Sequence, residues 1–110
     1  MEKMMFKAMY GDKAVRMVLD DDGLRFIIRD VCDILGYNNP NRILNRLGNT
    51  RREYARLKTD GGIQNVRLVT DDEICKLLCN ARTRATPAFA DWYFDTLSPF
   101  SKMFNRRCCK

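Results

Sequence analysis

A run of cationic and amide side chains in the middle of the chain has the chemistry needed to bind phosphates. Residues 41–67 carry seven basic and two acidic groups, a net charge of +5, whereas the whole chain carries +6. Arginine and lysine neutralise phosphate oxygens, and arginine and asparagine also hydrogen-bond to base edges. We therefore predict a nucleic-acid-binding surface formed by Arg42, Asn45, Arg46, Arg51, Arg52, Arg56, Lys58 and Arg67. The alternative is a solvated charged face without a partner.

Other groups that could support catalysis or bind a metal have simpler structural explanations. Asp20–Asp22 precede a glycine and fit a turn, and Asp71–Glu73 follow a threonine and fit a helix capping box. Cys75 and Cys79 are one helical turn apart, but a zinc site needs four ligands and the sequence has no histidine. We expect both cysteines to be small buried apolar residues. We accordingly expect no catalytic residues, no metal, no cofactor and no enzymatic activity.

The cysteine count and the apolar runs bear on the cellular location. Five cysteines are an odd number, and the first ten residues lack the apolar block of a secretory signal, so we expect reduced thiols. Cys108 and Cys109 are expected to react only adventitiously. Apolar runs are too short to cross a bilayer. These features predict an intracellular protein without membrane contact.

Four segments of the amino-terminal half are expected to position the basic cluster. Residues 3–10, 13–19 and 24–28 are β-leaning runs separated by turn signals, which predicts three strands. A short helix is expected from Asp30, ending at Gly36, which suits the left-handed position after a helix.

A second helix is predicted to carry part of the basic cluster. Asn39 is a good cap before Pro40, and the helix should end near Leu47. Its apolar positions share one face, while its polar positions point away from that face. The apolar positions are Ile43, Leu44 and Leu47, and the polar positions are Arg42, Asn45 and Arg46.

The remaining elements are a hairpin and two helices. Residues 51–58 and 63–69 flank a glycine turn and should pair, with basic side chains on both arms. Thr70 should cap a third helix, and Thr86 followed by Pro87 should start a fourth. Pro99 is expected to interrupt this last helix. Its aromatic face should pack in the core rather than stack on bases, and it consists of Phe89, Trp92, Tyr93, Leu97 and Phe100.

These elements predict an α+β fold, in which a small antiparallel sheet or hairpins pack with about four short helices. We expect one domain over residues 1–110, with residues 101–110 as a flexible tail. Phe94 lies off the aromatic face and is expected to be exposed or to sit at a subunit contact.

Several segments together resemble the amino-terminal domain of the BRO family of viral and phage proteins. The segment FIIRDVCDILGY, residues 26–37, is similar to the family's strand and following helix, and it continues into Asn38–Pro40 and Arg42–Leu44. Gly61–Gln64 and Leu68–Thr70 match the hairpin and the next helix start. Arg82, Phe89, Trp92 and Pro99 keep the family's spacing, whereas Ala81, Arg84 and Ser98 depart from its usual residues.

The resemblance covers about residues 15–100 and implies a DNA-binding regulatory protein, like a phage antirepressor, with no reaction and no cofactor. Because the chain ends ten residues after Phe100, we expect a stand-alone version of this domain. The expected partner is duplex DNA. The alternative is an interaction module that inhibits a host regulator or defence complex. Small DNA-binding domains gain affinity by dimerising over two half-sites, so a homodimer is one expected arrangement.

Overall fold

Two hairpins and a central strand form one antiparallel sheet of five strands. The computed structural model describes residues 4–21, 23–48 and 53–104. The strands are ordered β1-β2-β3-β5-β4 in the sheet. β3 therefore pairs with β5, although two helices and β4 lie between them in the chain. Their bounds are β1 Met4–Tyr10, β2 Lys13–Asp20, β3 Gly23–Ile27, β4 Glu53–Thr59 and β5 Gly62–Val69.

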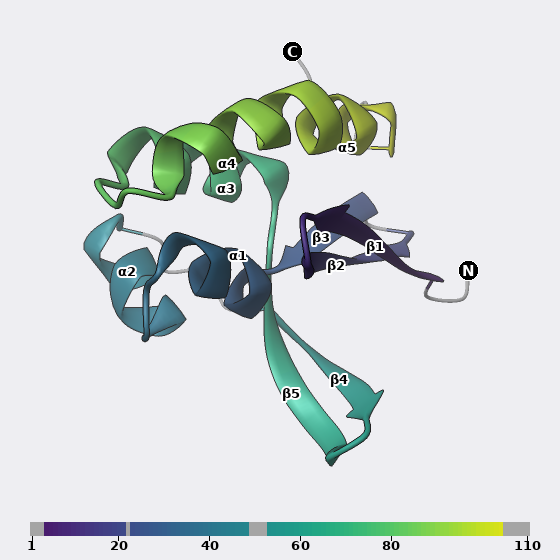
Figure 1. The fold of residues 1–110 in the computed structure, drawn as a ribbon. Coiled ribbons are helices and arrows are strands. Elements are labelled where there is room, and N and C mark those ends of the chain that lie inside the picture. The colour runs from purple at the N-terminus through teal and green to yellow at the C-terminus, as the bar shows by residue number, and fades with distance from the viewer. Residues whose placement is uncertain (1–3, 22, 49–52, 105–110) are drawn as a thin grey trace.

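Within the described residues, four helical runs accompany the sheet, which confirms the predicted α+β class. They are α1 Ile28–Leu35, α2 Pro40–Arg46, α3 Asp71–Asn80 and a continuous run of α4 Thr86–Trp92, the π-helix η1 Tyr93–Leu97 and α5 Ser98–Phe104. Figure 1 shows that the last two runs lie together on one side of the molecule, while the β4–β5 hairpin projects from the opposite side. None of the described helices is long and apolar enough to cross a membrane.

Local signals set most of the helix ends. The Asn39 side chain accepts a hydrogen bond from the Arg42 amide at 3.1 Å, which caps α2 as predicted. Thr70 and Glu73 form the predicted capping box of α3. Gly36 ends α1 with a φ of +91°, a left-handed conformation that glycine adopts without steric cost. α1 begins at Ile28, directly after β3 and earlier than predicted.

Two expectations about the last helical run are wrong. Thr86 is the first helical residue and not the cap; Ala85 takes that position, and the Thr86 hydroxyl instead hydrogen-bonds with the Thr83 hydroxyl at 2.9 Å. Pro99 does not end the run, because the chain widens into a π-helix immediately before it. Proline offers no N–H and crowds the carbonyl four residues earlier, and a wider turn accommodates both effects. The helix therefore continues through Phe104, so residues 101–104 are helical, while the rest of the expected tail, with Cys108 and Cys109, lies outside the described residues.

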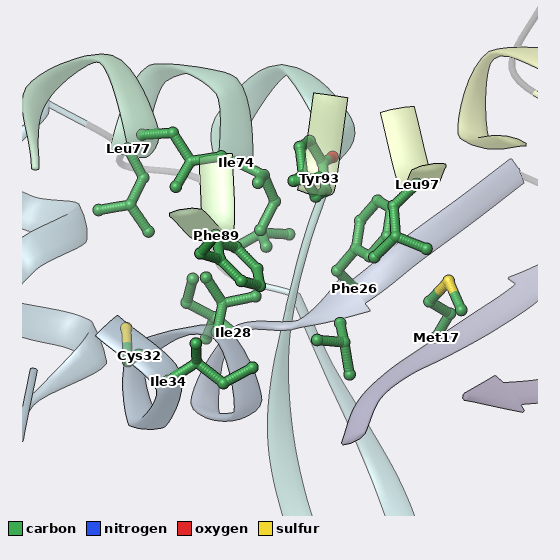
Figure 2. Packing of buried hydrophobic residues seen from close by; sticks show 14 of the residues in the cluster. Met17, Phe26, Ile28, Cys32, Ile34, Ile74, Leu77, Phe89, Tyr93 and Leu97 are labelled. Atoms are coloured by element: carbon green, nitrogen blue, oxygen red, sulfur yellow. The ribbon is translucent and has the colours of Figure 1, made fainter. Parts of the chain in front are cut away.

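The main core lies between one face of the sheet and the helices. Figure 2 shows Ile28 of α1, Ile74 of α3 and Phe89 of α4 converging in this core. Tyr93 packs edge-on against Phe26 of β3, with ring centroids 5.6 Å apart. The predicted aromatic face is thus a core element, since Phe89, Tyr93 and Leu97 are buried. Phe94 is 42% exposed, which agrees with the first of the two expectations for it, exposure or a subunit contact.

A second, smaller core attaches the projecting hairpin to the sheet. Val18 of β2 and Ile27 of β3 pack with Ala55, Val66 and Leu68 on the sheet face opposite the helices. Next to it, Arg25 is 3% exposed and forms ion pairs with Asp20 and Glu53. Apolar contacts and an ion pair therefore both hold the base of the hairpin.

A polar cluster is buried beside the π-helix. The Tyr93 hydroxyl donates a hydrogen bond to Asp71 Oδ1, and Ser98 Oγ donates one to Asp71 Oδ2 at 3.3 Å. Burial, followed by the hydrogen bond to Asp71, raises the pKa of Tyr93. Asp71 therefore joins the start of α3 to the first residue of η1 and to the first residue of α5, a role that the capping-box pattern did not indicate.

The described cysteines differ in their surroundings. Cys32 is buried in the main core, as a small apolar residue would be, and Cys75 is half-buried. Cys79 is exposed on α3, so the expectation that it is buried is wrong. Cys75 and Cys79 lie one turn apart on a helix that turns only the first of them inward.

Candidate nucleic-acid interface

The second helix presents a polar face as its sequence predicts. Leu44 is buried and Ile43 half-buried against the main core, which fixes the rotation of α2. The opposite face is exposed and carries Arg42, Asn45 and Arg46 together with Asn41.

The strand register places two hairpin cations on the same face as two polar groups nearer the body. Tyr54 pairs with Arg67, Arg56 with Asn65, and Lys58 with Ile63. Directly paired residues of an antiparallel ladder point to the same side, as do alternate residues along one strand. Arg56 and Lys58 are both exposed and therefore continue the face of Tyr54 and Asn65 toward the hairpin tip.

Arg67 does not belong to the exposed surface, and this part of the prediction is wrong. Its side chain is only 5% exposed, and Nη1 donates a hydrogen bond to Asn41 Oδ1 at 2.8 Å. The side chain lies on the hairpin face that lines the groove between the helices and the hairpin, and its guanidinium meets Asn41 of α2 there. Arg67 therefore joins β5 to α2. Two further residues of the prediction, Arg51 and Arg52, lie outside the described residues.

A groove of about 870 Å³ separates the helices from the hairpin. One wall comes from α1, α2 and the loop between them, and the other comes from β4 and β5. Among the described residues that line it, none is acidic. Its polar lining is Arg16, Arg29, Asn38, Asn39, Asn41, Tyr54, Gln64, Asn65 and Arg67, and its apolar lining is Ile28, Pro40 and Val66.

The three arginines that line the groove differ in their contacts and exposure. Arg16 forms a two-pronged pair with Asp30, with Nε–Oδ2 and Nη2–Oδ1 distances of 2.8 and 2.9 Å. The hydrogen bond to Asp30 raises the pKa of Arg16 and outweighs the opposing effect of burial. Arg67 is held by Asn41, whereas Arg29 is exposed on the first turn of α1.

The predicted residues do not all meet at this groove. Arg46 lines a separate hollow of about 460 Å³ between α2 and the end of α3, together with Arg82. Sequence reasoning missed Arg29, Asn38, Tyr54 and Asn65, because they lie outside the run of arginines or alternate with it. The alternation of Tyr54, Arg56 and Lys58 along one strand was the signal that could have joined Tyr54 to the cations.

The described residues contain no group of three or more histidine, cysteine or acidic side chains arranged to hold a metal ion. The site is thus a polar groove beside an exposed cationic face. Its chemistry suits hydrogen bonding and phosphate neutralisation.

Comparison with known proteins gives one family and one relative. A family model described as the BRO family, N-terminal domain, matches residues 14–99. An uncharacterized protein of Haemophilus influenzae is 28% identical over 94 residues, which cover 82% of this chain and 46% of the relative. The chain thus spans about half the length of this curated relative. No solved structure matches the chain.

Proposed function

This chain belongs to the BRO family, because most of it matches the family's N-terminal domain. On that premise we propose that it is a viral or phage regulatory protein that binds duplex DNA. The observation that carries the proposal is the presence of exposed cations both on α2 and on the hairpin that faces it across the groove. Arg42 and Arg46 lie on α2, and Arg56 and Lys58 lie on the groove-facing side of the hairpin.

These elements have shapes that fit a double helix. The major groove of B-DNA admits an α-helix or a two-stranded β-ribbon. The β4–β5 hairpin is such a ribbon, and Figure 1 shows it projecting well clear of the helices. The cations neutralise phosphates on either side, which supplies affinity without sequence preference. Binding needs no reaction and no cofactor, and an antirepressor-like role in the host cytoplasm or nucleus follows as the biological setting.

The test is a fluorescence-anisotropy titration of purified protein against random duplex DNA at low and moderate salt. Counterion release predicts an affinity that falls steeply as salt increases, with a logarithmic slope of about −0.9 for each neutralised phosphate. Gel filtration of the same sample shows whether a homodimer presents two such surfaces to successive half-sites. A folded sample that binds at neither salt concentration would overturn the proposal.

A second candidate function is inhibition of a host regulator or defence complex by direct contact. Two large apolar side chains on the last helical run favour it, because Phe94 is 42% and Met103 68% exposed. That run lies on the side of the molecule opposite the hairpin (Figure 1). Capture of one host protein that survives nuclease treatment, and that is lost in the Phe94→Ser variant, would favour this function over DNA binding.

A further inference from the structure

We propose that the groove between the α1–α2 segment and the hairpin recognises base edges and selects A·T pairs. This inference rests on the proposed DNA binding and adds a base preference to it. Each base pair presents its own pattern of donors, acceptors and methyl groups in the major groove, and the side chains of the protein groove match one pattern better than the others.

The groove offers little for a G·C pair. Guanine is most often recognised by an arginine that spans its O6 and N7 acceptors. The guanidinium of Arg16 is committed to Asp30 and that of Arg67 contacts Asn41, so among the described groove arginines Arg29 is the one whose exposed side chain could reach a guanine. Cytosine is recognised by a carboxylate that accepts from its N4 amino group. The described lining contains no acidic residue.

What the groove does offer is amide groups. Asn38 on the helical wall and Asn65 on β5 are both exposed and line the groove from opposite sides. The Asn41 oxygen already accepts from Arg67, which holds this amide in place and leaves its NH2 group available to a ligand. An amide has an adjacent donor and acceptor that match N7 and the N6 amino group of adenine. The exposed amides therefore fit adenine better than any other base.

Apolar groups beside these amides complete the match. Pro40 follows Asn38 and Asn39 along the chain and lines the same groove. Thymine is the base that presents a methyl group in the major groove, and apolar side chains contact it. Tyr54, which is 50% exposed, adds a further apolar surface on the hairpin wall.

The experiment measures the affinity of the full chain for three duplexes of equal length, composed only of A·T, G·C or inosine·cytosine pairs. Inosine·cytosine presents the minor groove of A·T but the guanine-like acceptors in the major groove. Recognition through the major groove therefore predicts that this duplex binds as weakly as G·C. The wild-type protein should prefer A·T by about fivefold or more for each adenine–amide contact.

The variants are Asn38→Ala with Asn65→Ala, and Asn80→Ala as the matched control. Asn80 is an exposed amide on α3 outside this groove, and its Nδ2 donates to the Lys76 carbonyl at 2.8 Å. The double variant should lose the A·T preference but keep the wild-type salt dependence, because amides carry no charge. The control should keep both.

Four results would overturn the inference while leaving the proposed function in place. Equal binding to all three duplexes removes the base preference and leaves DNA binding intact. Preference for G·C would assign the recognition to Arg29, and inosine·cytosine binding like A·T would assign it to minor-groove shape. A preference that survives in the folded double variant would place it outside the groove. Absence of binding to every duplex is a fifth result, and it would remove the proposed function as well.

Discussion

Arg67 of β5 and Asn41 of α2 are joined by a hydrogen bond of 2.8 Å from Nη1 to Oδ1, although 26 positions separate them in the chain. This contact links the two elements that carry the exposed cations. Because Arg67 is nearly buried, its guanidinium acts inside the fold and holds α2 against the hairpin.

Replacing Asn41 with alanine should lower the free energy of unfolding by about 1–3 kcal/mol, because a buried guanidinium loses an acceptor. Urea denaturation of the folded variant measures the loss. Asn45→Ala is the control, since this exposed amide lies on the same helix and should change stability by no more than about 0.5 kcal/mol. Equal losses in both variants would show that the Asn41–Arg67 contact adds nothing specific.

Replacing Arg56 and Lys58 with alanine should flatten the salt dependence of duplex binding by about 0.9 in logarithmic slope for each phosphate that is no longer neutralised. Titrations at several salt concentrations measure the slope. The matched control changes Lys76 and Lys102, two exposed cations on α3 and α5. An unchanged slope in the hairpin variant, or the same flattening in the control, would count against this surface.

Tyr93→Phe should destabilise the fold by about 1–3 kcal/mol, because the Asp71 carboxylate keeps its buried position but loses a donor. Thermal denaturation followed by circular dichroism gives the change. Tyr54→Phe removes an exposed hydroxyl and should leave the melting temperature nearly unchanged. An unchanged stability of Tyr93→Phe would mean that the remaining donors, Ser98 Oγ and Cys75 Sγ, satisfy the carboxylate.

Stability should fall as pH rises through the range in which Cys75 titrates. Burial, followed by the charge of Asp71, raises the pKa of this thiol from 9.0 to about 11. The folded state therefore holds the proton more tightly, so the contribution is complete below about pH 9 and is lost toward pH 11. Urea titrations across this range should show a shallower pH dependence for Cys75→Ala than for the wild type. Parallel curves of stability against pH for the two proteins would show that the Cys75 thiol does not contribute to this pH dependence.

The elements predictable from the sequence are those fixed by local signals. Asn39 before Pro40, the Thr70–Glu73 pair and Gly36 each act within a few residues, and the structure places each at the predicted helix end. The start of the last helix shows the limit of this approach. Thr86 and Pro87 fit a cap followed by a first turn. The hydroxyl of Thr86 instead hydrogen-bonds with that of Thr83, and Thr86 becomes the first residue of the helix.

The candidate site was only partly predictable, because charge indicates which residues prefer water and not which elements cover them. Arg42 and Arg46 are exposed because apolar neighbours fix the rotation of α2. Arg67 has the same charge but lies where its guanidinium meets Asn41 of α2, a contact between distant segments. The groove has the same origin, since its two walls approach only through tertiary packing.

The outer half of the hairpin is independent of both cores. Beyond Leu57 and before Val66, every side chain that the structure describes is exposed, and the second core ends at these two positions. Insertions, deletions or exchanges at this tip would therefore leave the folding of the domain untouched while altering the reach and charge of the ribbon. On the proposed function, such changes would alter the targets of the domain through one short stretch of coding sequence.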